Sequence, residues 1–311
     1  MAKSFSMESL NAAQRRAVQT LQGPVLILAG AGTGKTRTVT CRIAHMVDRG
    51  ISPKSILAVT FTNKAALEMR ERVGQMVDRK AARQIMVSTF HSLCVRILRE
   101  DIGRLGYKTN FTIYSGSEQS GLIRRLIVRH GGIKEKIGPK DVLSAMSRMK
   151  NNGLGIDSIE DNLTANIAAS YQRELQAQNS VDFDDLLILA DKLLKEHPDV
   201  RAAWQQRFRY ITVDEFQDTN TVQYNLIKIL GAKHGNIFVV GDEDQSIYGW
   251  RGANFANIFD FTTDYNCKVY KLEQNYRSTT TIVDAANSII SRNKEQIPKK
   301  TFSQNEEGDK I

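Results

Sequence analysis

One stretch near the N-terminus, Ala29-Gly30-Ala31-Gly32-Thr33-Gly34-Lys35-Thr36, limits the possible folds more than any other. It follows an apolar run at residues 24–28 that predicts a buried parallel strand. It precedes apolar residues at helical spacing that end at Gly50. A glycine-rich loop between a strand and a helix curls its backbone N–H groups around a phosphate, and the helix N-terminus adds positive charge. The context predicts a phosphate-binding loop rather than a glycine-rich turn that binds nothing.

The residues of this loop predict a nucleotide triphosphate and a divalent cation as ligands. Lys35 is expected to reach the β- and γ-phosphates of ATP, and the Thr36 hydroxyl is expected to take one site on Mg²⁺. The position where such loops usually begin with glycine holds Ala29, which is also small. We therefore expect residues 30–36 to bind the nucleotide.

Composition narrows the class of protein. The chain has 311 residues, of which 41% are apolar, so there is enough core material for more than one compact unit. Its net charge of +9 favours a polyanionic partner without proving one. Cys41, Cys94 and Cys267 lie far apart, which predicts reduced thiols and no zinc site. The first residues lack the apolar core of a signal peptide, and no apolar run approaches the ~20 residues of a membrane span, so we expect a cytoplasmic protein without a membrane partner.

Strand and helix patterns alternate along most of the chain. A short helix is predicted at residues 10–18. The predicted strands lie at residues 24–28, 55–61, 85–90, 111–114, 210–215, 237–242 and 267–272. This alternation predicts an α/β fold, a parallel sheet with helices on both faces. In such sheets ligands bind at the carboxyl ends of the strands, where Phe61, Asn63 and His91 also fall.

The alternation stops between about Ser117 and Val181, where helical patterns are separated by glycine-rich breaks. We expect an all-helical subdomain, residues 116–181, inserted into an α/β domain of residues 1–115 and 182–278. Between Glu118 and Lys150 there are eight Lys or Arg residues and three Asp or Glu residues. This basic stretch is expected either to contact a nucleic-acid backbone or to form a solvated helical face, and charge alone does not separate the two.

Two carboxylates end the strand predicted at residues 210–215. Asp214 is expected to hold the hydrated Mg²⁺, and Glu215 is expected to orient or deprotonate the water that attacks the γ-phosphate. An acidic pair on a surface is the alternative, but the phosphate-binding loop earlier in the chain favours the catalytic interpretation.

The segment after the next strand carries an amide and two aromatic residues. Gln245 lies one strand over from Glu215, within reach of a γ-phosphate. Tyr248, Trp250 and Arg251 follow within six residues, and aromatic rings with an arginine suit base stacking and phosphate contact on a single strand. A packed aromatic cluster is the alternative on composition alone.

Together these segments resemble the superfamily 1 DNA helicases of the UvrD/Rep/PcrA family. The matching motifs are the Q motif at residues 10–14, Walker A at 29–36, motif Ia at 58–66, motif Ib at 88–92, motif II at 213–218, motif III at 240–253 and motif IV at 273–278. The match runs from residue 10 to about 280 in the order of the family. It implies a RecA-like P-loop NTPase fold.

The resemblance also implies roles for single residues. Gln14 would read adenine, Tyr276 would stack on it, Arg37 would line the nucleotide, and Arg277 would stabilise charge on the transferred γ-phosphoryl group. The predicted catalytic residues are Lys35, Glu215, Gln245 and Arg277. The residues expected to line the single-strand path are Phe61, Asn63, His91, Tyr248, Trp250 and Arg251. We expect motif III to couple the sites, with Gln245 sensing the γ-phosphate while Tyr248 and Trp250 contact bases.

One departure from the family bears on function. Family members continue into a second RecA-like subdomain with motifs V and VI, which are absent from this sequence, so residues 279–311 are expected to begin that missing motor half. The resemblance therefore implies the N-terminal part of an ATP-dependent 3′-to-5′ DNA helicase that uses Mg²⁺ and acts on single-stranded DNA and single-strand/double-strand junctions. We expect this part alone to hydrolyse ATP weakly. Two alternatives stay open: the ATPase part of a helicase–nuclease, and a nucleotide-dependent DNA-binding module without motor action.

Overall fold

The chain divides into two units, each with its own hydrophobic core. The computed structural model describes residues 6–131, 137–249, 252–293 and 297–311. Unit 1 comprises Met1–Thr89, Trp204–Thr219 and Leu230–Ile311, and unit 2 comprises Phe90–Ala203 and Asn220–Ile229.

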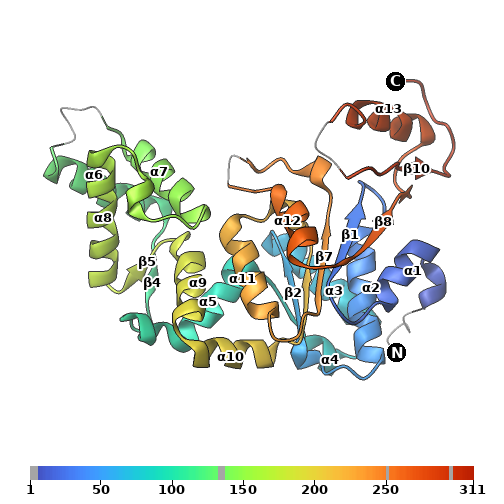
Figure 1. Cartoon of the computed structure of the whole chain (residues 1–311), viewed down its shortest axis with the longest axis horizontal. Helices are drawn as coiled ribbons and strands as arrows, with labels where there is room; N and C mark the ends of the chain where they lie inside the picture. The colour runs from blue at the N-terminus through green and yellow to red at the C-terminus, as the bar shows by residue number, and fades with distance from the viewer. Residues whose placement is uncertain (1–5, 132–136, 250–251, 294–296) are drawn as a thin grey trace. The chain divides into compact units, whose positions relative to one another are not determined.

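Unit 1 is built on a six-stranded sheet in which every pairing is parallel (Figure 1). Its strands, in the order β3-β2-β6-β7-β1-β8, are β3 (Met86–Thr89), β2 (Ile56–Thr60), β6 (Tyr210–Val213), β7 (Ile237–Gly241), β1 (Val25–Ala29) and β8 (Lys268–Leu272). The predicted α/β fold with a parallel sheet is confirmed. The strand that leads into the phosphate-binding loop is interior, because β1 pairs with both β7 and β8.

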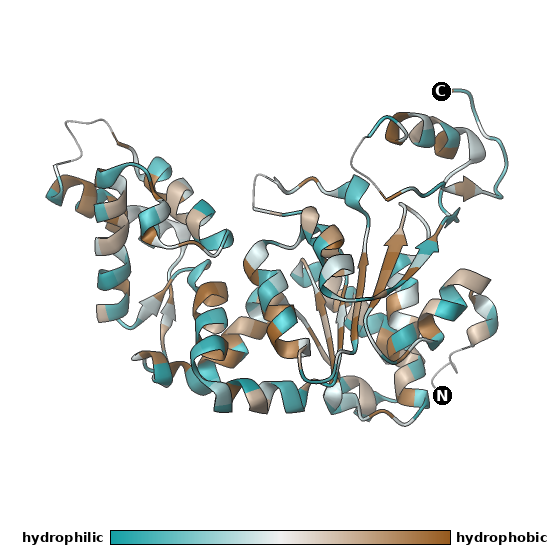
Figure 2. Ribbon diagram, viewed as in Figure 1, coloured by the Kyte–Doolittle hydropathy of each residue, from teal (hydrophilic) through white to brown (hydrophobic). Residues whose placement is uncertain are grey.

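Both faces of the central sheet are covered. All residues of β1, β2 and β7 are buried, as expected for strands with helices on either side, and Figure 2 shows these strands as hydrophobic. Helices α2 (Lys35–Asp48) and α3 (Asn63–Met76) share one apolar core with alternate residues of β1, β2 and β7. The phosphate-binding loop is thus held between a buried strand and a buried helix.

The remaining α-helices and strands that lie wholly in unit 1 are arranged around the sheet. They are α1 (Ala12–Gln19), α4 (Arg79–Gln84), α12 (Ala256–Asp264), α13 (Thr280–Ile290), β9 (Gln274–Asn275) and β10 (Phe302–Ser303). Helix α13 begins after its N-cap Thr279, where the sequence predicts a helix. The parallel pairing of β9 with β10 was not predicted, because two residues are too few to show a strand pattern.

Unit 2 is mainly helical. It contains α5 (Phe90–Asp101), β4 (Thr112–Ile113), α6 (Gly116–Arg129), α7 (Pro139–Asn151), α8 (Asn162–Ala177), β5 (Ser180–Val181) and α9 (Asp185–Glu196). Two more helices cross the boundary between the units along the chain: α10 (Pro198–Arg207) and α11 (Thr221–Gly231). Helices α6, α7 and α8 enclose a separate apolar cluster that includes Leu122, Val142 and Ile167.

Three details of the prediction for this region were wrong. The strand predicted at residues 111–114 forms, but it pairs with β5 instead of joining the central sheet, so the region is not purely helical. The apolar pattern of residues 181–187 predicts a helix that begins at residue 181, whereas α9 begins at Asp185. Lys150 does not belong to a solvated basic face, because it is buried and its Nζ lies 2.7 Å from both Asp182 Oδ2 and Asp185 Oδ1.

Within the part of the chain that the structure describes, no helix combines the length and the apolar character needed to cross a bilayer.

Candidate active site

The phosphate-binding loop occupies residues 30–34, between the end of β1 and the start of α2. Gly32 and Gly34 have φ angles of 72° and 86°, in the left-handed region that favours glycine. A Cβ atom on Gly32 would lie 2.7 Å from Asn275 Nδ2, and one on Gly34 would lie 2.8 Å from Gln14 Nε2. Both glycines are therefore required by their backbone conformation and by close neighbours.

Groups from outside the loop fix its shape by donating hydrogen bonds to its carbonyl oxygens. These bonds run from Gln14 Nε2 to Thr33 O (2.9 Å), from Asn275 Nδ2 to Ala31 O (2.8 Å) and from the backbone N–H of Tyr276 to Gly32 O (3.0 Å). The donors come from α1 and from the segment after β8, so both ends of unit 1 hold the loop. These three hydrogen bonds therefore set the conformation of the loop.

Lys35 presents a cation with no hydrogen-bond acceptor in the described part of the chain. Its Nζ is buried, and the nearest opposite charge is Glu215 Oε2 at 3.8 Å. A buried ammonium without hydrogen-bond partners costs free energy, and phosphate oxygens would supply the missing acceptors. Thr36 follows in the first turn of α2, where its half-buried hydroxyl adjoins the loop. These residues fit the phosphates of ATP.

Two carboxylates follow β6, as the sequence predicted. Asp214 is only 5% exposed, and burial, helped by the negative charge of Glu215, raises the pKa of Asp214 to about 7, although the charge of Lys35 acts in the opposite direction. A cation beside such a carboxyl would favour its ionised form, so Asp214 and Thr36 fit a Mg²⁺ ion. Glu215 has a φ of 53°, which is uncommon for a residue other than glycine and is concentrated at functional sites.

A buried glutamine that the sequence analysis did not single out links the two carboxylate-bearing segments. Gln217 is 2% exposed; its Nε2 donates to Glu215 Oε2 (2.8 Å), and its Oε1 accepts from the backbone N–H of Asp242 (3.0 Å). Gln245 Nε2 in turn donates to the carboxylate of Asp242. A continuous polar chain therefore joins the ends of β6 and β7. The only signal for Gln217 was its place inside the motif II stretch.

The residues expected around the adenine lie beside the loop. The Gln14 amide is buried, with its Oε1 accepting from the backbone N–H of Asn11 (3.1 Å) and its Nε2 holding the loop. The Tyr276 ring is 49% exposed, and its hydroxyl accepts from Asn11 Nδ2 (2.8 Å). An exposed ring next to the buried amide is compatible with stacking on a base, which stays a prediction.

The two predicted arginines also lie at this edge of unit 1. Arg37, in the first turn of α2, donates to Ser9 O (3.0 Å). Arg277 is exposed, and its Cβ lies 2.9 Å from the position that a Cβ on Gly32 would occupy. The structure therefore brings both arginines to the phosphate-binding loop, although they are far apart in the sequence.

The residues predicted to contact DNA in unit 1 lie in part beside one another. The rings of Phe61 and Tyr248 stack with their centroids 5.0 Å apart, and Asn63 is exposed at the first position of α3. Trp250 and Arg251 lie outside the described residues. The stacked pair shows that these rings share one surface, and their contact with DNA stays a prediction.

In unit 2, His91 stacks on Phe183, with ring centroids 3.8 Å apart and an interplanar angle of 16°. Burial lowers the pKa of His91 to about 4, so the imidazole is neutral at neutral pH. Phe183 is 54% exposed and was not singled out from the sequence. An aromatic residue between acidic residues, just ahead of α9, is the feature that marks it.

Two family models match the chain. The model described as the UvrD/REP helicase N-terminal domain matches residues 10–266. The model described as the UvrD-like helicase C-terminal domain matches residues 270–311.

Several curated proteins are similar over nearly the whole chain. The protein named ATP-dependent DNA helicase PcrA from Leuconostoc citreum is 48% identical over 97% of this chain and 42% of that protein. Proteins of the same name from Staphylococcus aureus strain Mu50 and Staphylococcus epidermidis are each 44% identical over 98% of this chain and 43% of their own lengths. The chain thus spans less than half the length of these relatives. With the phosphate-binding loop, the carboxylates after β6 and the first family model in agreement, the chain belongs to the UvrD/Rep helicase family.

Proposed function

We propose that the protein is the ATP- and DNA-binding part of an ATP-dependent DNA helicase. The observation that carries this proposal is the buried Lys35 ammonium, which has no hydrogen-bond partner among the residues that the structure describes and lies 3.8 Å from Glu215 Oε2. The relatives are named ATP-dependent DNA helicases, which supports the same activity here. We further infer movement from 3′ to 5′ along single-stranded DNA, action at single-strand/double-strand junctions, and a cytoplasmic location.

The division of the chain into subdomains is part of the proposal. We infer a motor subdomain from residues 1–115 and 182–278, an inserted subdomain from residues 116–181, and the start of a second motor subdomain at residues 279–311. The match of residues 270–311 to the C-terminal-domain model supports the last of these. The separate apolar cluster of α6, α7 and α8 supports the second.

Each residue of the proposed site has a separate role in ATP hydrolysis. Lys35 holds the β- and γ-phosphates, and Thr36 and Asp214 are the ligands for Mg²⁺, which when bound neutralises phosphate charge. Glu215 orients the attacking water and accepts its proton, while Gln217 holds the Glu215 carboxylate in place.

Two further side chains act on the γ-phosphate from other segments. Gln245 contacts it from the loop after β7, and Arg277 stabilises the charge that develops on it during transfer. The position of Arg277 close to Gly32 supports its role.

Single-stranded DNA is the proposed second ligand. Phe61, Tyr248 and Trp250 would stack on bases, Asn63 and Arg251 would contact the strand, and His91 would contribute as a neutral ring. Gln245 and Tyr248 belong to one short segment, so a γ-phosphate contact at the first residue can shift the ring of the second. Loss of DNA-stimulated hydrolysis in Gln245→Ala would support this coupling, and unchanged stimulation would rule it out.

The test is ATP hydrolysis with and without single-stranded DNA, with Glu215→Gln as the control. We expect DNA to stimulate the unchanged chain and Glu215→Gln to lower turnover by about 10²–10³-fold, since it removes the base for the attacking water. The affinity for ATP, measured by fluorescence with a labelled analogue, should change little. If Glu215→Gln lost binding and turnover to the same degree, Glu215 would be a binding residue.

One of the two alternatives left open by the sequence, the binding module, is an outcome of the same test. ATP and DNA binding without stimulated hydrolysis would identify a nucleotide-dependent DNA-binding module. The hydrolytic set of Lys35, Glu215 and Gln245 in one site favours the enzyme over the module. A helicase–nuclease would require residues beyond these 311, and the relatives carry the helicase name alone.

A further inference from the structure

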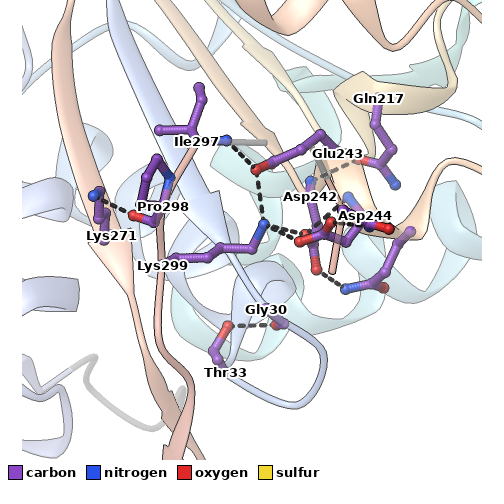
Figure 3. A network of polar contacts seen from close by, with 12 residues as sticks. Gly30, Thr33, Gln217, Asp242, Glu243, Asp244, Lys271, Ile297, Pro298 and Lys299 are labelled. Atoms are coloured by element: carbon purple, nitrogen blue, oxygen red, sulfur yellow. Dashed lines mark hydrogen bonds and ion pairs between the residues drawn. The ribbon is translucent and has the colours of Figure 1, made fainter. Parts of the chain in front are cut away.

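A single lysine near the C-terminus of the chain binds three consecutive carboxylates of motif III (Figure 3). Lys299 Nζ lies 2.8 Å from Asp242 Oδ1, 2.9 Å from Glu243 Oε1 and 2.6 Å from Asp244 Oδ2. The side chain of Lys299 is 5% exposed, and those of the three acidic residues are 4%, 1% and 6% exposed. The cluster is therefore an interior feature of unit 1.

The charges in this cluster make Lys299 hard to replace. Three carboxylates share one ammonium, and Glu243 Oε2 is buried without a hydrogen-bond partner among the described residues. Although burial acts to lower it, hydrogen bonds to Asp242 and Asp244 raise the pKa of Lys299 above its ordinary value, so the lysine stays charged. Removing the ammonium would leave carboxylates buried and uncompensated, which is among the most destabilising local changes.

The segment that carries Lys299 contacts the same acidic residues through other groups. The backbone N–H of Ile297 donates to Glu243 Oε1 (3.0 Å), and Asn293 Nδ2 donates to Asp244 Oδ1 (2.9 Å). All three donors lie in the range matched by the C-terminal-domain model. The acidic residues lie in the range matched by the N-terminal-domain model. Lys299 therefore connects the two matched regions at the loop after β7.

The connection extends to the predicted γ-phosphate sensor. One oxygen of Asp242 binds Lys299, and the other accepts a hydrogen bond from Gln245 Nε2. The backbone N–H of Asp242 is also bound, by Gln217 Oε1 (3.0 Å). Asp242 therefore has Lys299 on one side and two residues of the hydrolytic network on the other.

We propose that Lys299 is a positioning residue: by anchoring Asp242, Glu243 and Asp244, it sets the orientation of Gln245 toward the γ-phosphate of ATP. Lys299 is linked to Gln245 through Asp242, because one carboxylate oxygen of Asp242 binds Lys299 and the other accepts a hydrogen bond from Gln245. A movement of residues 297–303 would alter the loop through this contact, and the rate of hydrolysis with it. The role of Gln245 rests on the proposed function, whereas the anchoring of the loop does not.

The test compares Lys299→Met with Lys300→Met in the full 311-residue chain. Lys300 is a matched control, because it is the next residue, its side chain is exposed, and its bond to Glu273 is made by the backbone N–H. We expect Lys299→Met to lower the kcat of DNA-stimulated ATP hydrolysis by about tenfold, with the ATP dissociation constant within about twofold of the unchanged chain. Lys300→Met should change neither.

Backbone amide hydrogen exchange gives a readout that does not need turnover. In Lys299→Met the amides of residues 242–249 should exchange faster, while those of β1 should not. Addition of a non-hydrolysable ATP analogue should slow exchange at these amides in the unchanged chain and less so in Lys299→Met. If the unchanged chain failed to hydrolyse ATP, the proposed function would be wrong. The hydrogen-exchange measurement would still show whether Lys299 anchors the loop after β7.

Two further variants separate positioning from general loss of folding. Lys299→Arg keeps the charge and should recover most of the kcat. Asp244→Asn combined with Lys299→Met removes one of the three carboxylates left uncompensated, so it should recover part of the lost folded fraction without restoring kcat. The proposal is overturned if Lys299→Met leaves both kcat and exchange unchanged, or if kcat falls only in proportion to the folded fraction.

Discussion

Lys35 and Glu215 are both held in arrangements that cost free energy in the folded protein. Within the described part of the chain, the Lys35 ammonium is buried without a hydrogen-bond acceptor, and Glu215 has a left-handed backbone conformation. Each costs on the order of 1–3 kcal/mol, and the surrounding buried strands hold both in place. Such costs are expected where side chains are arranged for a ligand that is bound only part of the time.

Gly32 allows a single-residue test of the loop. We expect Gly32→Ala to destabilise the protein by about 1–3 kcal/mol, because the new Cβ would meet Asn275 Nδ2 at 2.7 Å and Arg277 Cβ at 2.9 Å in a left-handed conformation. Loss of the ordered loop should also weaken ATP binding. Denaturant unfolding and a titration with a fluorescent ATP analogue measure the two effects.

Gly23 provides the matched control for that substitution. Its φ of 78° is as unfavourable for alanine, but a Cβ there would meet no atom of the described residues within 4 Å. Gly23→Ala should therefore lower the free energy of unfolding by about 1 kcal/mol, the contribution of the left-handed backbone conformation alone. ATP binding should be unaffected. Equal losses of stability in the two variants would show that the neighbours of Gly32 give way.

At the scale of elements, short polar contacts determine where several segments begin. Helix α1 starts with a reciprocal capping box in which Asn11 and Gln14 bind each other's backbone, and the same Gln14 amide holds the phosphate-binding loop. In unit 2, Asp182 and Asp185 exchange similar bonds ahead of α9. Lys150, from α7, forms ion pairs with both of these carboxylates.

The ion pairs of Lys150 with Asp182 and Asp185 are expected to contribute to the free energy of unfolding of unit 2. We expect Lys150→Met to cost about 3–5 kcal/mol, because it leaves Asp182 and Asp185 buried without a cation. Denaturant unfolding, with hydrogen exchange in α7 and α9 as the local probe, measures the loss. Lys192→Met serves as the control: its pair with Glu196 is exposed at 4.0 Å and should contribute at most about 0.5 kcal/mol. Equal losses of stability in Lys150→Met and Lys192→Met would contradict the conclusion that burial makes the Lys150 ion pairs important.

At the scale of the whole molecule, the net charge of +9 and the stacked rings make different contributions to the proposed DNA binding. Phosphate contacts release counterions, so the affinity for single strands falls with salt, whereas stacking is much less sensitive to it. Basic and aromatic residues can therefore be told apart by how the affinity varies with salt concentration.

We expect the logarithm of the affinity for an oligothymidylate to fall linearly with the logarithm of the salt concentration. Lys64→Ala, which removes an exposed cation at the start of α3, should reduce the magnitude of the slope by about 0.7. Tyr248→Ala should lower the affinity about tenfold or more at every salt concentration and leave the slope unchanged. Fluorescence anisotropy measures both. A change of slope in Tyr248→Ala would assign that ring an indirect role in phosphate contact.

Local sequence determined the parts of this protein whose signals are short-range. Strands such as β1 and β7 are apolar throughout because parallel strands are buried on both faces, so their runs were predicted to within one or two residues. The loop after β1 carries its own signal, since phosphate binding requires glycines followed by Lys35 and Thr36. The acidic pair at Asp214 and Glu215 was predicted because it directly follows a buried run.

Only the tertiary structure decided which distant residues complete the site. The pairing of β4 with β5 involves two residues in each strand, too few for a pattern to show. Gln217, Phe183 and Lys299 are ordinary residues in the sequence, and their importance comes from their neighbours in space: Lys299 and Asp244 are 55 residues apart along the chain. A sequence pattern reports periodicity and local geometry, whereas burial of a charge against particular partners depends on how the whole unit packs.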